Sequence, residues 1–124
     1  MENVYDEYLD RDYNTMLLNL FPNLKEKFDE YTSWQEGIDT GSTLVYEDVF
    51  IPYAIEQIAN NNQEEISKII YLIDEMVNSN NRYCQNLVEV AILEALRADP
   101  EGQKIRDYLT DNSLSMYDGL SMFK

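Results

Sequence analysis

Apolar side chains that recur at helical spacing in the second half of the chain constrain the fold more than any other feature. They are Ile66, Ile69, Ile70, Ile73, Met76 and Val77. This spacing places them on one face of an amphipathic helix. Asn62, with Glu65 three residues later, is an Asn-led variant of the capping box that opens helices. The sequence therefore predicts a helix that starts after Asn62 and stops in the polar run Asn78–Asn81.

A second helix is predicted directly afterwards. The same spacing continues in Cys84, Leu87, Val88, Ala91, Ile92 and Ala95. Leu93 and Leu96 widen this apolar face, so we expect the helix to be central. The pair of helices from Gln63 to Arg97 resembles a single helical-repeat unit. Asp99 and Pro100 suit the N-cap and the first position of another short helix. Its inner face would be formed by Ile105, Tyr108 and Leu109.

Two prolines divide the expected helices of the first half. One helical face continues across Pro22, formed by Leu17, Leu20, Phe21, Leu24, Phe28 and Tyr31. Proline inside a helix costs about 3 kcal/mol, so we expect a break or sharp kink there, with Pro22 starting a new turn. Glycines and polar residues predict a loop from Gly37 to Thr43. A helical stripe restarts at Tyr46, and Pro52 must lie near the start of that helix or bend it.

The two ends of the chain leave alternatives open. Residues 1–12 either extend the first helix or remain loose. Within residues 111–124, Asp118-Gly119 between Leu114–Tyr117 and Leu120–Phe123 suggests a two-residue hairpin turn. The same apolar residues also fit one helix face. We favour the helix, because an isolated two-stranded hairpin is marginally stable.

These patterns predict an all-α fold. At 124 residues the chain is long enough for one domain with a core. Its hydrophobic fraction of 44% separates it from acidic disordered tails, which lack the apolar surface to offset ordering entropy. We expect a single compact domain over residues 1–124, of about five to seven helices, with the helical-repeat-like hairpin in the centre.

Charge patterning indicates the kind of partner. From Phe28 to Ser67 there is no Lys or Arg. The same span carries nine carboxylates, namely Asp29, Glu30, Glu36, Asp39, Glu47, Asp48, Glu56, Glu64 and Glu65. With a formal net charge of −15, the chain should repel nucleic acids and anionic membranes and should associate quickly with cationic proteins. The simpler alternative is that the acid only keeps the protein in solution.

Six residues of this span are the candidate partner-binding set: Trp34, Glu36, Asp39, Tyr46, Glu47 and Asp48. Large aromatic side chains among carboxylates are typical of interfaces with basic proteins. Trp34 could equally be a core residue. Glu47 and Asp48 could equally be acids that stabilise a helix start.

Catalytic and metal chemistry find little support in the sequence. There is no His, and the one Cys, Cys84, lies on an apolar helix face, where we expect a buried hydrophobe. Asp10, Asp12 and Asn14 match the start of a calcium loop. Thr15 replaces its glycine and Phe21 its closing Glu. We expect no enzyme activity, no cofactor and no metal. A lone Cys, with no signal or membrane segment apparent, favours the cytoplasm.

Four segments resemble small acidic all-helical bacterial proteins that include immunity proteins of polymorphic toxin systems. The segments are Phe50–Tyr53, Ile69–Val77, Asn86–Glu89 and Leu93–Leu96. The resemblance covers roughly residues 16–109, and the tail after Leu109 departs from it. It implies a protein that binds a cognate toxin and blocks its active site or substrate groove. It assigns no role to an individual residue.

The sequence thus predicts an acidic, non-catalytic inhibitor of a basic protein, with a toxin immunity protein as the specific form. The first alternative is a nucleic-acid mimic of the antirestriction or anti-CRISPR type, which would need acids spaced regularly along one face. The second is a carboxylate-based enzyme, which would need an enclosed pocket with convergent acids of perturbed pKa.

Overall fold

The computed structural model describes residues 2–120, with side chains from residue 10 onward, and it is helical with no strand in that range. The all-α prediction is confirmed. Apart from the single turn Gly37–Asp39, consecutive elements join into seven helices of the described chain, within the predicted number. They cover 2–20, 22–32, 42–59, 63–77, 82–97, 102–108 and 111–120. Contacts group the chain into two compact units, Met1–Phe50 and Ile51–Lys124, called here the N-terminal unit and the C-terminal unit.

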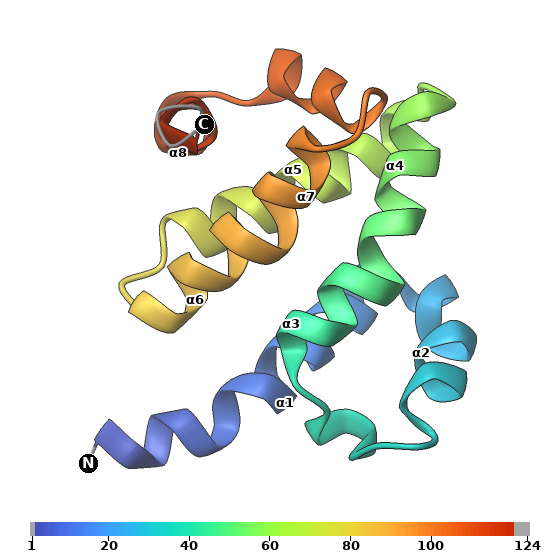
Figure 1. The fold of residues 1–124 in the computed structure, drawn as a ribbon, viewed down its shortest axis with the longest axis vertical. Helices are drawn as coiled ribbons and strands as arrows, with labels where there is room; N and C mark the ends of the chain where they lie inside the picture. Colours follow the sequence, from blue (N-terminus) through green and yellow to red (C-terminus); the bar gives the residue numbers. More distant parts are fainter. Residues whose placement is uncertain (1, 121–124) are drawn as a thin grey trace. The chain divides into compact units, whose positions relative to one another are not determined.

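The N-terminal unit consists of α1, α2 and α3 with short turns between them (Figure 1). Its elements are α1 (Glu2–Leu20), η1 (Pro22–Leu24), α2 (Lys25–Thr32), η2 (Gly37–Asp39), α3 (Ser42–Val45) and the π-helical η3 (Tyr46–Phe50). The break at Pro22 is confirmed, because Phe21 leaves the helical region at φ −127° and ψ 70° and Pro22 opens η1. Residues 2–12 extend α1, while Met1 lies outside the described residues.

The core of the N-terminal unit brings together α1, α2 and η3. Its buried apolar residues are Leu17, Phe21, Leu24, Phe28, Val45, Tyr46, Val49 and Phe50. The Phe50 ring lies 5.3 Å from that of Phe21 and 5.9 Å from that of Tyr46, which it meets edge to face. Such aromatic pairs add about 1 kcal/mol beyond their buried area.

Polar side chains of α1 fasten the loop that precedes α3. The buried amide of Asn14 donates hydrogen bonds to the carbonyls of Ile38 and Thr40, at 2.9 and 2.8 Å. The Asp10 carboxylate accepts from the backbone N–H and the hydroxyl of Ser42, at 3.0 and 2.7 Å, and so satisfies an N–H at the start of α3. Arg11 forms a two-bond ion pair with Asp39. Two residues of the partial calcium-loop pattern, Asp10 and Asn14, therefore hold a loop.

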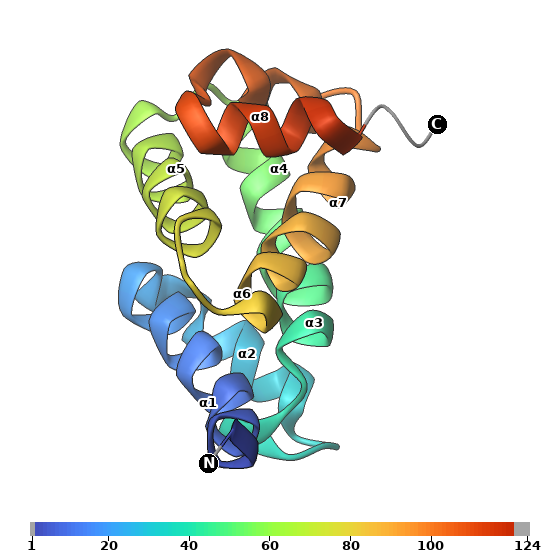
Figure 2. The same ribbon diagram turned by 90° about the vertical axis from the view of Figure 1, so that its left-hand side faces the viewer.

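In the C-terminal unit α5 lies beside the rod formed by α6, η4 and α7, and α8 packs on α5 and η4 (Figure 2). The elements are α4 (Ile51–Ala59), α5 (Gln63–Val77), α6 (Arg82–Leu87), the π-helical η4 (Val88–Leu93), α7 (Glu94–Arg97), the 3₁₀ helix η5 (Gly102–Tyr108) and α8 (Asp111–Leu120). Pro52 is the second residue of α4, near its start as predicted, and follows the wide π turn η3.

The predicted caps and faces of this unit are largely confirmed. The Asn62 side chain accepts from the Glu65 backbone N–H at the start of α5. Residues of the rod are fully buried, namely Val88, Ala91, Ile92, Leu93 and Leu96, and Cys84 is 2% exposed. Within α5 the fully buried Leu72 extends the predicted stripe, whereas Ile70 is only half-buried. Asp99 caps the next segment through the N–H groups of Glu101 and Gly102, and that segment is a 3₁₀ helix.

The tail from Asp111 to Leu120 is helical, so the hairpin alternative is wrong for Leu114–Tyr117 and for Asp118-Gly119. Tyr117 and Leu120 face the core, and the Ser113 hydroxyl donates a hydrogen bond to the carboxylate of Asp74 in α5. Docking on α5 supplies the packing that a short helix needs. The remainder of the second predicted strand, Ser121–Phe123, lies outside the described residues.

Gly102 tests the close packing of η5 against α7. A Cβ atom there would lie 2.4 Å from the backbone oxygen of Leu96, which cannot move without the helix. We expect Gly102→Ala to destabilise the protein by about 2 kcal/mol or more, measured by urea unfolding. Gly119→Ala in α8 is the matched control, because its Cβ meets no atom within 4 Å. It should be neutral or slightly stabilising. Equal effects of the two changes would contradict this close approach of η5 to α7.

The Tyr53–Glu65 contact predicts a pH-dependent contribution to stability. Tyr53 of α4 donates a 2.5 Å hydrogen bond to the Glu65 carboxylate of α5, and Lys68 lies 3.1 Å from that carboxylate. The hydrogen bond first, and Lys68 next, hold the pKa of Glu65 below its usual 4.5, against the opposing effect of burial. A lowered folded-state pKa stabilises the fold above the unfolded value and loses this effect as pH falls through the folded value.

We therefore expect Tyr53→Phe to cost about 1 kcal/mol of unfolding free energy at neutral pH. The difference from the native protein should shrink as pH falls below 4.5. Tyr71→Phe removes the same oxygen from an exposed side chain of α5 and should change stability little at either pH. A Tyr53→Phe deficit that persists unchanged in acid would show that the hydrogen bond to the charged carboxylate is not its source.

Candidate functional site

Trp34 lies in the turn that follows α2 and is 91% exposed. The alternative that Trp34 is a core residue is therefore wrong. Tryptophan is on average a highly buried residue, so an indole almost wholly in water leaves a large apolar surface without a packing partner. Burying such a side chain in an interface is a common source of binding energy.

The predicted carboxylates are exposed as well. Glu36 follows Trp34 in the same turn, and Glu47 and Asp48 lie in η3. Because α3 already begins at Ser42, the latter two come after the first helical turn, and their placement is not explained by a helix start. Their side chains face solvent, so their charges are available to a cationic partner.

Asp39 has a role within the fold. Both its oxygens bind the Arg11 guanidinium at 2.9 Å, and this hydrogen-bonded pair holds the pKa of Asp39 below its usual value. The pair is solvent-exposed and joins η2 to α1. Asp39 therefore contributes less net negative potential than the other acids of the predicted set.

Tyr46 corrects the sequence prediction. Its ring is 0% exposed in the core of the N-terminal unit, and its hydroxyl donates a 2.6 Å hydrogen bond to the carbonyl of Tyr13. The prediction that Tyr46 contacts a partner is wrong, because the apolar face of the helix that carries it packs on α1. Glu47 and Asp48 follow it in sequence but project from the opposite, exposed side.

The structure adds a shallow recess between α2 and η3, called here the Tyr31 recess. It has a volume of about 280 Å³ and is lined by Lys27, Glu30, Tyr31, Asp48 and Val49. Tyr31 donates a 2.5 Å hydrogen bond to the Asp48 carboxylate. This bond, then burial and the negative charge of Asp48, raises the pKa of Tyr31. The hydroxyl therefore stays protonated, and its ring lines a site that holds two carboxylates.

Sequence reasoning missed most of this recess. Lys27, Glu30 and Tyr31 lie three and four residues apart, which places them on one face of α2. That spacing was readable from the sequence. The contact with Asp48, 17 residues later, depends on how η3 packs against α2.

Chemically, the recess can hold an ammonium or guanidinium group. Glu30 and Asp48 supply carboxylate acceptors, and the Tyr31 ring offers a surface for cation–π contact. Lys27 lines the same recess and offsets part of the charge. Among the described residues no cluster of three or more His, Cys, Asp and Glu is arranged to hold a metal ion. Nor does any helix in the described part combine the length and apolar character needed to span a membrane.

Comparison with known proteins yields one family. A family model described as "Domain of unknown function (DUF7674)" matches residues 14–124, which include every residue of the Tyr31 recess as well as Trp34 and Glu36. Searches among curated proteins and among solved structures found no match. The resemblance to immunity proteins of toxin systems therefore stays a prediction.

The titration of Tyr31 tests the geometry of the recess. We expect Asp48→Asn to lower the pKa of Tyr31 toward its ordinary value of 10.0, because the charged acceptor is the main cause of the shift. The measurement is an NMR titration of the Cζ resonance of isotope-labelled tyrosine. Glu36→Gln removes one exposed charge of the same sign that does not act on Tyr31. An equal shift in both variants would mean that the general negative field, rather than the Asp48 contact, controls Tyr31.

Proposed function

We propose that this chain, which belongs to the family described as domain of unknown function DUF7674, is a non-catalytic binding protein that captures a basic protein on its N-terminal unit. The observation that supports this most is the exposure of the only tryptophan, Trp34, in the same turn as the exposed carboxylate of Glu36. The binding surface comprises Trp34, Glu36, Glu47 and Asp48 together with the Tyr31 recess.

The two parts of this surface would contribute differently. Exposed carboxylates steer a cationic protein toward the surface and raise the association rate at low salt. Burial of Trp34 would slow release, because a well-packed aromatic anchor contributes about 2 kcal/mol or more to binding. The Tyr31 recess would receive one lysine or arginine side chain of the partner and fix the orientation of the complex.

The specific form that we propose is an immunity protein that neutralises a cognate bacterial toxin. Two arguments support it: the net charge of −15, which suits a basic toxin domain, and the resemblance of four core segments to immunity-type proteins. An inhibitor of this kind needs no catalytic group of its own. It would act by blocking the active site or an exosite of the toxin.

The experiment uses the full chain labelled with 5-fluorotryptophan, which gives one ¹⁹F resonance because the sequence holds one tryptophan. The titrant is the basic protein that the immobilised chain retains at low salt and releases at high salt, or the product of an adjacent toxin-like gene. We expect binding to shift the Trp34 resonance. Co-expression should rescue cells from a toxic partner.

Two sets of variants distinguish binding at the proposed surface from a general effect of the net charge. Glu47→Lys with Asp48→Lys should slow association at least about ten-fold at low salt, and Trp34→Ala should speed dissociation by a similar factor. The control pair Glu75→Lys with Glu94→Lys changes the same charge on exposed positions of α5 and α7 and should slow association far less.

An unmoved Trp34 resonance, or equal effects of the two charge-reversal pairs, would refute the proposed surface. Binding that is insensitive to Trp34→Ala, with a nucleic-acid-binding enzyme as the partner, would favour the nucleic-acid mimic. Binding without rescue of cells would reject the immunity form and leave the coarser binding function standing.

A further inference from the structure

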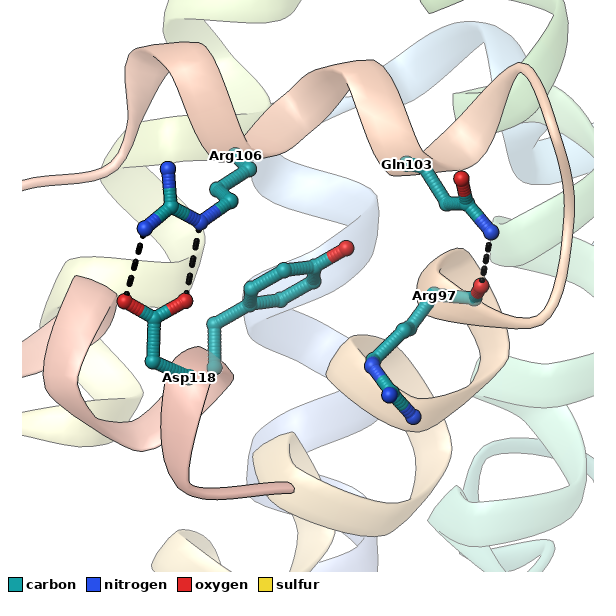
Figure 3. Close-up of a pocket in the computed structure, with 5 residues that line it drawn as sticks. Arg97, Gln103, Arg106 and Asp118 are labelled. Atoms are coloured by element: carbon teal, nitrogen blue, oxygen red, sulfur yellow. Dashed lines mark hydrogen bonds and ion pairs between the residues drawn. The ribbon is translucent and has the colours of Figure 1, made fainter. Parts of the chain in front are cut away.

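The C-terminal unit contains a second recess of different character, called here the Arg97 recess. It has a volume of about 500 Å³ and opens to solvent between α7, η5 and α8. Arg97, Gln103, Arg106, Tyr117 and Asp118 line it (Figure 3). Two arginines in one recess are notable in a chain with nine basic residues and 24 acidic ones.

Arg106 is already neutralised. Its Nε and Nη2 atoms lie 2.8 and 2.9 Å from the two carboxylate oxygens of Asp118, in a two-bond pair that ties η5 to α8. Figure 3 shows this pair on one side of the recess, with Arg97 and Gln103 on the other. The Asp118 carboxylate is thus used by Arg106, and the charge of Arg97 is left uncompensated.

Arg97 is half-buried, and its guanidinium has no hydrogen-bond or ion-pair partner among residues 10–120. Its backbone carbonyl accepts a 2.9 Å hydrogen bond from the Gln103 side chain. That bond uses one amide N–H of Gln103 and leaves its Oε1 atom available as an acceptor. The end of α7 and the start of η5 are thereby held at a fixed spacing around the recess.

Tyr117 contributes a hydroxyl to the recess. Its side chain is 5% exposed, and within the described part of the chain its hydroxyl has no hydrogen-bond partner. Burial raises the pKa of Tyr117, while Arg97 and Arg106 act in the opposite direction through their positive charge. The neutral hydroxyl is therefore a donor in a positive local field, which suits an anionic acceptor.

We propose that the Arg97 recess binds a small organic molecule through a carboxylate group, with the Arg97 guanidinium and the Tyr117 hydroxyl as donors. A recess of about 500 Å³ lies within the usual range of small-molecule sites. Planar guanidinium groups bind carboxylates through two parallel hydrogen bonds. A hydroxyl or amine of the same molecule would reach Oε1 of Gln103.

Charge selects the ligand class. Arg97 and Arg106 together with Asp118 give the recess a net charge of one positive unit. A single carboxylate neutralises it. A phosphate dianion would leave an excess negative charge beside Asp118, within a chain whose net charge is already −15. The site should therefore prefer a singly charged carboxylate over phosphate.

Arg97 also lies in the last turn of α7, where any cation stabilises the helix end. Lysine would serve that purpose as well as arginine, but it lacks the planar fork. Arg97→Lys thus separates helix stabilisation from carboxylate binding.

The experiment is an NMR titration of the full-length protein with sodium acetate and with benzoate at constant ionic strength, chloride being the exchanged anion. Saturable shifts are expected at the Gln103 side-chain amide and at Tyr117. Arg97→Gln should weaken binding at least about ten-fold, Arg97→Lys by less, and Tyr117→Phe by about three-fold or more. Arg82→Gln, which removes the same charge from an exposed position of α6, should change affinity less than about two-fold.

Shifts that never saturate, equal losses in Arg97→Gln and Arg82→Gln, or tighter binding of inorganic phosphate than of either carboxylate would each overturn the proposal. Thermal unfolding of every variant confirms that it is folded. Tyr117→Phe removes only an oxygen and keeps the test decisive even if Arg97→Gln unfolds the protein.

Discussion

Burial of apolar helical faces has to hold this protein together against the mutual repulsion of its carboxylates. In the N-terminal unit the buried face is centred on Phe21, Tyr46 and Phe50, and in the C-terminal unit on the rod from Arg82 to Arg97. Each fully buried aliphatic or aromatic side chain contributes about 1.5 to 3 kcal/mol. Exposed ion pairs contribute little by comparison, so the ion pairs of this chain position loops and helices more than they stabilise the whole.

Basic residues are scarce, and three of those that the structure describes hold particular elements of the fold. Arg11 fastens the loop at Asp39, Arg106 joins η5 to α8 through Asp118, and Lys68 supports Glu65. The exposed carboxylates of Glu36, Glu47 and Asp48 belong to the binding surface that we propose together with Trp34. The half-buried Arg97, by contrast, is left with uncompensated positive charge. For one acidic chain we therefore propose two surfaces of opposite preference, one for a basic protein and one for a small anion.

Local patterns predicted the helices well, because their determinants lie within a few residues of each other. Asn62 and Asp99 cap the segments that follow them, Pro22 separates two helices, and Cys84 is buried on the face that its spacing indicated. The tail was ambiguous between helix and hairpin because its apolar spacing suits both. Docking on α5, which the sequence does not reveal, is associated with the helix.

The candidate site was only partly accessible to sequence reasoning. Composition and charge determined that the middle of the chain is negative and rich in aromatic residues. Only the tertiary structure decided that Trp34 is exposed, that Tyr46 is buried, that Asp39 is paired with Arg11, and that Tyr31 meets Asp48. The physical reason is one of range. Helix formation follows from neighbours three and four residues apart, whereas the exposure and pairing of these side chains depend on which distant segments pack together.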